Sequence, residues 1–408
     1  MTADAEDRLA GPRGRTTLVT SLLVAGIVLL AMSLRAPYTG VGALLPRIRD
    51  DYALTAVAAG VLASLPLLAF GLVSPLAVPI SRRLGMERTL FVVLVVIAAG
   101  VALRFLPQAW ALFVGTAMLG GAIAVANVLL PSLVKRDFPG HVTTVTSLYV
   151  TGMSFLGALA AGVAVPIADV APGGWRTSIG CWGILTVIAL AVWAPQLARA
   201  TATAIAERRA AEAAPAGPPV WRSLTAWKVT AYMGLQSFSF YVVISWEPTV
   251  LLQYGVSAED AGWLIFILQG LGLPAGFMVP LFVRYLGSPR LLAVLCSLGV
   301  LIGYTGLALW PRLALLWVIV VGPCSGGCFM LALAFLSLRA GGAREAAALS
   351  GMAQSLGYLL AGAGPVLFGL LHDMTGAWVA SFVLLLVMTA LQCVAAYAAG
   401  GPGEVGRS

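Results

Sequence analysis

One arginine, Arg35, interrupts a long stretch of uncharged residues near the start of the chain. Nineteen uncharged residues, 16–34, precede it, and eleven more, 36–46, separate it from Arg47. A guanidinium keeps its charge and offers five donors, so an arginine without an acidic partner can bind a carboxylate-like or nitro-like acceptor. We therefore expect Arg35 to face a cavity that takes an anionic or strongly polar solute. The alternative is an arginine whose head reaches the lipid head groups.

Neutral polar side chains in other apolar stretches could complete such a site. Gln354 and Tyr358 are four residues apart, which places them on one face of a helix. No Asp or Glu lies deep in an apolar stretch, and the nearest, Glu247, lies toward one end of its stretch. For each amide, a hydrogen bond between helices is the alternative role. The predicted substrate-binding residues are Arg35, Tyr38, Asn127, Gln236, Gln269, Gln354 and Tyr358.

The composition is that of a protein that crosses a membrane many times. Of all residues, 60% are hydrophobic and 10% are charged, whereas a soluble domain is about half apolar and about a quarter charged. The net charge of +8 does not indicate nucleic-acid binding, because basic residues also mark cytoplasmic loops.

Metal, cofactor and catalytic chemistry are not expected. Cys324 and Cys328 share a helix face, but no further Cys, His or acid lies near them in sequence, so no metal site is predicted. The two histidines, His141 and His372, lie at the ends of apolar stretches, and no His-Glu or Ser-His-Asp grouping is present. A membrane enzyme or a sensor is therefore the least favoured class.

Twelve uncharged runs are long enough to span a membrane, since about 20 apolar residues cross a core of about 30 Å. With the N-terminus in the cytosol, eighteen Lys and Arg residues fall in inner segments and five in outer segments. This asymmetry predicts that both termini of this multi-pass protein are on the cytoplasmic side of the cytoplasmic (inner) membrane. The predicted spans are 17–46, 56–80, 89–106, 110–134, 142–167, 176–194, 227–252, 261–284, 291–310, 313–337, 347–371 and 377–398. The outer basic residues are Arg47, Arg49, Arg104, Arg176 and Arg312.

An Ala- and Pro-rich segment with charges of both signs divides the chain into two halves of six spans each. We predict a cytoplasmic tail at 1–16, an N-terminal six-helix bundle at 17–194 and a cytoplasmic linker at 195–226. A C-terminal six-helix bundle at 227–398 and a cytoplasmic tail at 399–408 complete the predicted organisation.

The two halves repeat one motif in the same direction. At a shift of 202 residues, DYALTAVAAG (51–60) aligns with QYGVSAEDAG, and RRLGMERTL (82–90) aligns with RYLGSPRLL. Two halves of six spans enter the membrane in the same orientation, which is typical of a transporter whose substrate site lies between parallel repeats near the midplane. Runs of small residues at 152–162 and 350–365 allow close helix packing, and we expect these runs to pair across the halves as sliding surfaces.

Five stretches resemble the cyanate/2-nitroimidazole porter family of major-facilitator transporters. They are RAPYTGVGALLPRI, LASLPLLAFGLVSPLA, ANVLLPSLVKRDFP, YVVISWEPTVLLQYGVS and LSGMAQSLGYLLAGAGPVLFGLLHD, and the resemblance runs from the first span to the twelfth. It implies an all-α membrane protein with the major-facilitator fold, in which twelve transmembrane helices form two parallel six-helix repeats. It also implies alternating access, with uptake of a small anion such as cyanate or export of a small nitro-aromatic. Glu247 departs from the family, whose members tend to have an apolar residue there.

The repeated loop Arg-x-Leu-Gly-x-x-Arg resembles the cytoplasmic loop signature of the same superfamily. Arg82 stands where the acid of that signature is usual, so the salt bridge of an inner gate would be formed by other residues here. A plain cytoplasmic basic loop is the alternative reading. The predicted gating residues are Arg82, Arg83, Arg136, Asp137 and Arg284.

We expect a monomeric secondary transporter whose partners are a small anionic or polar molecule and the lipid bilayer, with a proton as a candidate coupling ion. The alternative is a multidrug or metabolite efflux pump of the same superfamily, which the aromatic residues Phe238, Phe240, Tyr241 and Trp246 would suit. The lack of a deep acid argues against a porter for cationic drugs, and it weakens any proton coupling that needs a deep carboxylate.

Overall fold

The computed structural model describes residues 12–138, 141–199, 220–340 and 343–403. These residues form helices and connecting turns, without a β-strand element among them. Residues 1–11 of the predicted N-terminal tail lie outside the described residues, and 12–16 belong to the first helix. Most of the linker and the last five residues of the C-terminal tail also lie outside the described residues.

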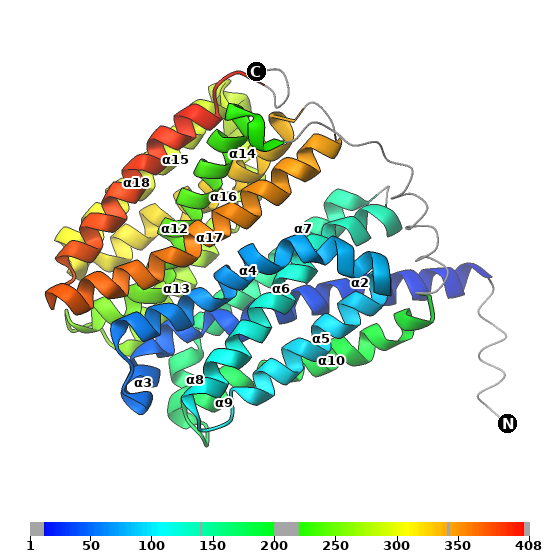
Figure 1. Ribbon diagram of the computed structural model, residues 1–408, viewed down its shortest axis with the longest axis horizontal. Coiled ribbons are helices and arrows are strands. Elements are labelled where there is room, and N and C mark those ends of the chain that lie inside the picture. The colour runs from blue at the N-terminus through cyan, green and yellow to red at the C-terminus, as the bar shows by residue number, and fades with distance from the viewer. Residues whose placement is uncertain (1–11, 139–140, 200–219, 341–342, 404–408) are drawn as a thin grey trace.

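The N-terminal half contains nine α-helices within its described residues (Figure 1). Most of these helices are long and apolar, short helices lie between some of them, and the short 3-10 segment Ala194–Arg199 closes this half. The α-helices are α2 (Pro12–Thr39), α3 (Val41–Tyr52), α4 (Ala56–Leu84), α5 (Met86–Leu103), α6 (Ala109–Asp137), α7 (Val142–Gly162), α8 (Ala164–Val170), α9 (Trp175–Gly180) and α10 (Gly183–Trp193).

The C-terminal half forms a second bundle that meets the first at one end and diverges from it toward the other (Figure 1). Ten segments of the described chain, from both bundles, are long and apolar enough to cross a membrane. The count of twelve spans stays a prediction. The α-helices of the second bundle are α12 (Leu224–Leu252), α13 (Ala258–Gly272), α14 (Ala275–Leu286), α15 (Pro289–Leu309), α16 (Ala314–Leu338), α17 (Ala343–Thr375) and α18 (Val379–Ala399).

Four of the predicted spans are broken helices rather than continuous ones: α2–α3, α7–α8, α9–α10 and α13–α14. The break between α2 and α3 falls at Gly40, just after Pro37, and the break between α13 and α14 includes Pro274. A proline lacks the N–H that would continue the helical hydrogen-bond ladder, which explains these two interruptions. The first break lies a few residues after Arg35 and therefore shapes the predicted site.

The repeat appears in the way equivalent helices begin and end. Helix α4 begins after Thr55, whose hydroxyl accepts a hydrogen bond from the Ala58 N–H, and α13 begins after Ser257, whose hydroxyl accepts one from the Asp260 N–H. Helix α4 ends at Gly85 and the broken helix α13–α14 ends at Gly287, and both glycines have positive φ. These caps are 202 residues apart, at the shift found in the sequence, and polar caps of this kind fix helix ends.

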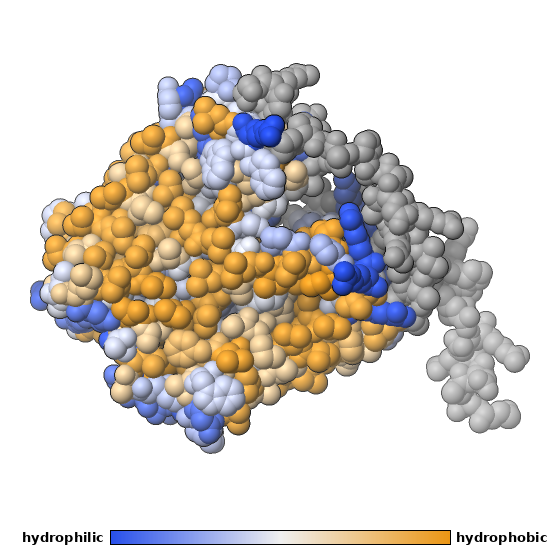
Figure 2. Space-filling view, in the orientation of Figure 1, coloured by the Kyte–Doolittle hydropathy of each residue, from blue (hydrophilic) through white to orange (hydrophobic). Residues whose placement is uncertain are grey.

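The outer surface of both bundles is apolar, as Figure 2 shows. Large side chains such as Leu72 (65% exposed) and Leu281 (64% exposed) point away from the protein. Apolar faces of this extent are unfavourable in water and favourable against lipid tails, so the surface fits a protein that is embedded in a bilayer.

Candidate functional site

Arg35 lies between the two halves. Its aliphatic stem packs on Gly157 of α7, where an added Cβ would lie 2.9 Å from the Arg35 Cγ. The guanidinium lies beside the side chain of Tyr241 of α12, which belongs to the other half. The arginine is half-buried between these elements, and no acid among the described residues pairs with it.

Three tyrosines surround this guanidinium. The rings of Tyr38 and Tyr241 are 6.5 Å apart between centroids, and those of Tyr241 and Tyr358 are 6.4 Å apart. Phe70 of α4 packs on Tyr358 at 4.6 Å. We call Arg35, Tyr38, Phe70, Tyr241 and Tyr358 the Arg35 cluster. It offers one positive charge, three hydroxyl groups and aromatic faces, a set that suits a small planar acceptor such as an anion or a nitro-aromatic.

The helix that carries Arg35 is held at its break by two other elements. The Thr39 hydroxyl donates to the Gly157 carbonyl at 2.6 Å, and Nη1 of Arg104 donates to the Pro37 carbonyl at 2.7 Å. Backbone carbonyls near a helix break need partners from elsewhere when they are buried. These two bonds therefore fix the segment from Arg35 to Gly40 against α5 and α7.

The four remaining predicted binding residues are not part of the Arg35 cluster as defined above. The Gln236 amide donates to Ser237 Oγ at 2.7 Å and the Gln354 amide donates to Ser350 Oγ at 2.8 Å, so each bonds within its own helix. Nε2 of Gln269 is buried and has no hydrogen-bond partner in the described part of the chain. Asn127 is half-buried in α6. Their part in substrate binding stays a prediction.

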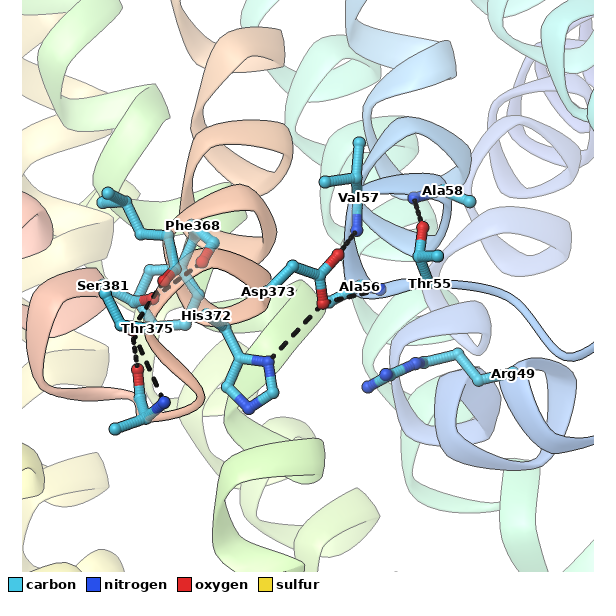
Figure 3. Close-up of polar contacts among 12 residues, drawn as sticks. Arg49, Thr55, Ala56, Val57, Ala58, Phe368, His372, Asp373, Thr375 and Ser381 are labelled. Carbon is cyan, nitrogen blue, oxygen red and sulfur yellow. Dashed lines mark hydrogen bonds and ion pairs between the residues drawn. The ribbon is translucent and has the colours of Figure 1, made fainter.

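An acid of the C-terminal half binds the N-terminus of a helix in the N-terminal half. The Asp373 carboxylate of α17 accepts hydrogen bonds from the backbone N–H groups of Ala56 (3.2 Å) and Val57 (2.8 Å) at the start of α4 (Figure 3). The partial positive charge of a helix N-terminus favours a carboxylate there. We call this contact the Asp373 clasp. No local pattern in the sequence predicts this contact, because the partners are more than 300 residues apart.

Glycines bring the two halves into backbone contact on the same side as the Asp373 clasp. An added Cβ at Gly60 of α4 would lie 2.5 Å from the Pro365 carbonyl of α17, and one at Gly262 of α13 would lie 3.1 Å from the Ala161 carbonyl of α7. The expected pairing of the small-residue runs is therefore wrong in detail. Each run packs against a helix of the other half, α7 on α13 and α17 on α4, rather than against the equivalent run.

The positive-inside prediction makes the clasped end the outer end, and we use that name below. Toward the opposite, inner end, the surface is hollowed between the two lobes (Figure 2). At the inner end of the N-terminal half, Arg136 binds Glu87 at 2.6 Å and Asp137 at 2.7 Å. The other predicted gating residues, Arg82, Arg83 and Arg284, are exposed. The gating role of all five stays a prediction.

Glu247 is buried inside the C-terminal bundle at 6% exposure. It lines an apolar cavity with Tyr304, Phe368 and Leu385, and neither carboxylate oxygen has a hydrogen-bond partner within the described residues. The cavity is walled by α12, α15, α17 and α18, so Glu247 points away from the Arg35 cluster.

The arrangement of two bundles around a site shared by both agrees with the sequence comparisons. The family model of the Major Facilitator Superfamily matches residues 22–362. The chain belongs to this superfamily. This match and the all-helical fold confirm the predicted fold class, and the protein is a multi-pass membrane transporter rather than an enzyme.

Two curated relatives place this major-facilitator protein in the cyanate/2-nitroimidazole porter family. It is 41% identical over 384 residues to the 2-nitroimidazole transporter of Escherichia coli (strain K12), covering 94% of this chain and 96% of the relative. It is 27% identical over 355 residues to the cyanate transport protein CynX of the same organism, covering 86% and 90%. A solved D-xylose-proton symporter shares the fold with a TM-score of 0.73 at 15% identity, covering 93% of this chain and 96% of that chain.

Proposed function

We propose that this protein is a secondary active transporter that moves a small anionic or polar solute, cyanate-like or nitroimidazole-like, across the cytoplasmic membrane by alternating access. The observation that carries the proposal is the contact of Arg35 and Tyr38 with Tyr241, because this contact spans the two halves. A solute that binds there contacts both halves at once, and parallel major-facilitator repeats bind their substrates at this interface.

The chemistry of the Arg35 cluster supports an acceptor rather than a cation as cargo. Arg35 is the charged member of the cluster, and the tyrosine hydroxyls around it can each donate a hydrogen bond. The names of the two relatives point to cyanate, a small anion, and to a nitro-aromatic, a planar polar ring. Both carry oxygen or nitrogen acceptors that a guanidinium can bind, and the flanking aromatic rings suit the second.

Alternating access would follow from movement of the halves around this site. The structure is closed at the clasped outer end and hollowed at the inner end, so a solute could reach the cluster from the inner side. Opening the outer end requires the Asp373 clasp and the α4–α17 contacts to separate. A solute that bridges Arg35 and Tyr241 would favour intermediate states in which the halves close around it.

The second candidate is a drug or metabolite efflux pump of the same superfamily. The aromatic content of the cluster, with Phe240 packed on Tyr241 at 5.3 Å, favours this reading because aromatic rings accept varied planar drugs. The two functions differ in selectivity. A carrier built on Arg35 should discriminate strongly between an anion and a neutral isostere, and a drug pump should not.

A binding screen tests the proposal without assuming a direction of transport. Purified protein is heated with cyanate, other small anions or nitroimidazoles, and a bound ligand raises Tm by mass action. We expect cyanate or a nitroimidazole to stabilise the wild type and to leave Arg35→Gln unchanged. Equal stabilisation of both proteins would contradict the site, and stabilisation only by unrelated bulky drugs would favour the efflux pump.

A further inference from the structure

Arg104 is a second buried cation near the transport path. It follows the last residue of α5 and is only 2% exposed, so it lies inside the N-terminal bundle, although the sequence analysis counted it among the basic residues of the outer segments. Of its three guanidinium nitrogens, Nη1 donates to the Pro37 carbonyl at 2.7 Å. Nε and Nη2 are buried and have no hydrogen-bond partner in the described part of the chain.

The charge of Arg104 is uncompensated, unlike that of two other arginines near the outer end. Arg47 forms an ion pair with Asp169 at 2.6 Å, and Arg176 forms one with Asp51 at 2.8 Å. Within the described residues Arg104 has no acidic partner and meets only a backbone carbonyl. An unpaired charge inside a membrane protein is costly, and such residues usually face a path for a charged solute.

The guanidinium lies behind the wall of a cavity between the two halves. Its stem packs on Gly115 of α6, where an added Cβ would lie 2.7 Å from the Arg104 Cγ. Thr116, the residue after Gly115, lines the cavity, and so do Tyr38 and Thr39, which follow Pro37. Ile244 and Ser245 of α12 close the cavity from the other half, and none of the described residues that line it is acidic.

This cavity lies outward of the Arg35 cluster along α2 and α3. Its N-terminal lining runs from Tyr38 through Leu45, toward the clasped end, and Tyr38 belongs to both the cavity and the Arg35 cluster. A solute that moved between the outer side and Arg35 would therefore pass this cavity and the buried charge behind its wall.

We propose that Arg104 forms a second, outer binding position for the anionic solute, which passes between Arg104 and Arg35 during transport. When the outer end is closed and the position is empty, one nitrogen of Arg104 binds the Pro37 carbonyl and two lack partners. When the outer end opens, an anion supplies acceptors for those two nitrogens. This inference rests on the proposed function, because it assumes that the solute is an acceptor that also binds Arg35.

Sided transport measurements separate this role from that of a structural clamp on α2. Uptake of cyanate and of 2-nitroimidazole is measured in membrane vesicles of both orientations for wild type, Arg104→Gln, Arg104→Lys and the control Arg47→Gln. For Arg104→Gln we expect the KM on the outer side to rise about tenfold and the KM on the inner side to stay at the wild-type value. Arg104→Lys keeps the charge but loses the planar guanidinium, so its outer-side KM should lie between those of the wild type and Arg104→Gln. Both KM values of Arg47→Gln should match the wild type.

A structural clamp would give a different pattern. Loss of such a clamp in Arg104→Gln would displace Arg35 and change its binding of solutes from either side. Equal KM changes on both sides, or no change on either, would therefore overturn the proposal. If the wild type transports neither solute, the proposed function fails first, and a second measurement still tests Arg104 itself.

That second measurement probes the charge in the cavity directly. A cysteine replacing Thr116 is labelled from the outer side with a negatively and a positively charged thiol reagent of matched size, and the product is identified by mass spectrometry. We expect the negative reagent to react at least severalfold faster, and the preference to vanish when Arg104→Gln is added. Equal rates before that change would overturn the proposal.

Discussion

The guanidinium of Arg35 in the N-terminal half lies beside the side chain of Tyr241 in the C-terminal half. This contact crosses the interface about which the halves of a major-facilitator protein move. The pair therefore connects substrate recognition to the relative position of the halves, and the predictions below follow from that link and from the contacts around it.

Removing the Tyr241 hydroxyl should weaken solute binding moderately. Tyr241→Phe keeps the ring contacts with Tyr38 and Phe240 but removes a neutral hydrogen-bonding group, which is worth about 0.5–1.5 kcal/mol. We expect about three- to tenfold weaker binding in a ligand titration. Tyr285→Phe, at a residue that is 86% exposed on α14, is the matched control. Unchanged affinity in Tyr241→Phe would remove this hydroxyl from the site.

The position of Arg35 should depend on a glycine on the neighbouring helix. In Gly157→Ala the new Cβ would lie 2.9 Å from the Arg35 Cγ, which pushes the stem away from α7. In Gly152→Ala, on the same helix, the nearest contact is an ordinary 3.5 Å to Met32. Both changes gain about 1 kcal/mol of helix propensity. We expect Gly152→Ala to raise Tm with unchanged affinity and Gly157→Ala to lose affinity; equal affinities in the two variants would contradict the packing argument.

The Asp373 clasp should hold the outer end closed. Asp373→Asn replaces a charged acceptor with a neutral one, and a charged hydrogen bond is worth about 1.5–3 kcal/mol. We expect a larger population that is open to the outside, read as faster labelling from the outer side of a cysteine that replaces the buried Ser245. Asp50→Asn, at an exposed acid of α3, is the control. Labelling at the wild-type rate would show that the clasp does not limit opening.

The buried carboxyl of Glu247 should lower the free energy of unfolding without taking part in anion recognition. Glu247→Leu removes a buried carboxyl without a partner from an apolar cavity, so we expect the free energy of unfolding to rise by about 1–3 kcal/mol, seen as a higher Tm. Glu259→Leu, at an exposed position, should leave Tm nearly unchanged.

Solute exchange by Glu247→Leu should remain at the wild-type rate, because the cavity faces away from Arg35. Loss of accumulation driven by a proton gradient, with exchange retained, would instead assign the coupling proton to Glu247.

Features set by local sequence were predicted well. The uncharged runs located the helices, and the motif repeated at a shift of 202 residues matched the equivalent caps at Thr55 and Ser257. Arg35 stood out because a lone charge in a long apolar run has few stable surroundings. The breaks after Pro37 and at Pro274 were missed, although proline marks them, because hydrophobicity alone does not register a missing N–H.

Contacts between distant segments could not be predicted in the same way. Tyr241 was grouped with the aromatic residues that would suit a drug pump, and nothing local shows that it faces Arg35 across more than 200 residues. Arg104 was counted among the basic residues of the outer segments, because its burial depends on the packing of α5 against α6. Asp373 bonds backbone groups, which leave no pattern in the side chains of their own segment.

The most direct test of the account is the affinity of purified wild type, Arg35→Lys and Arg35→Gln for cyanate and for a neutral isostere of similar size. We predict that Arg35→Gln binds the anion about 10- to 100-fold more weakly than the wild type, with the folded state intact by Tm. Arg35→Lys should be intermediate, and the neutral isostere should bind all three proteins alike. Anion affinity that is the same in wild type and Arg35→Gln would contradict the central claim that the partner of Arg35 is the cargo.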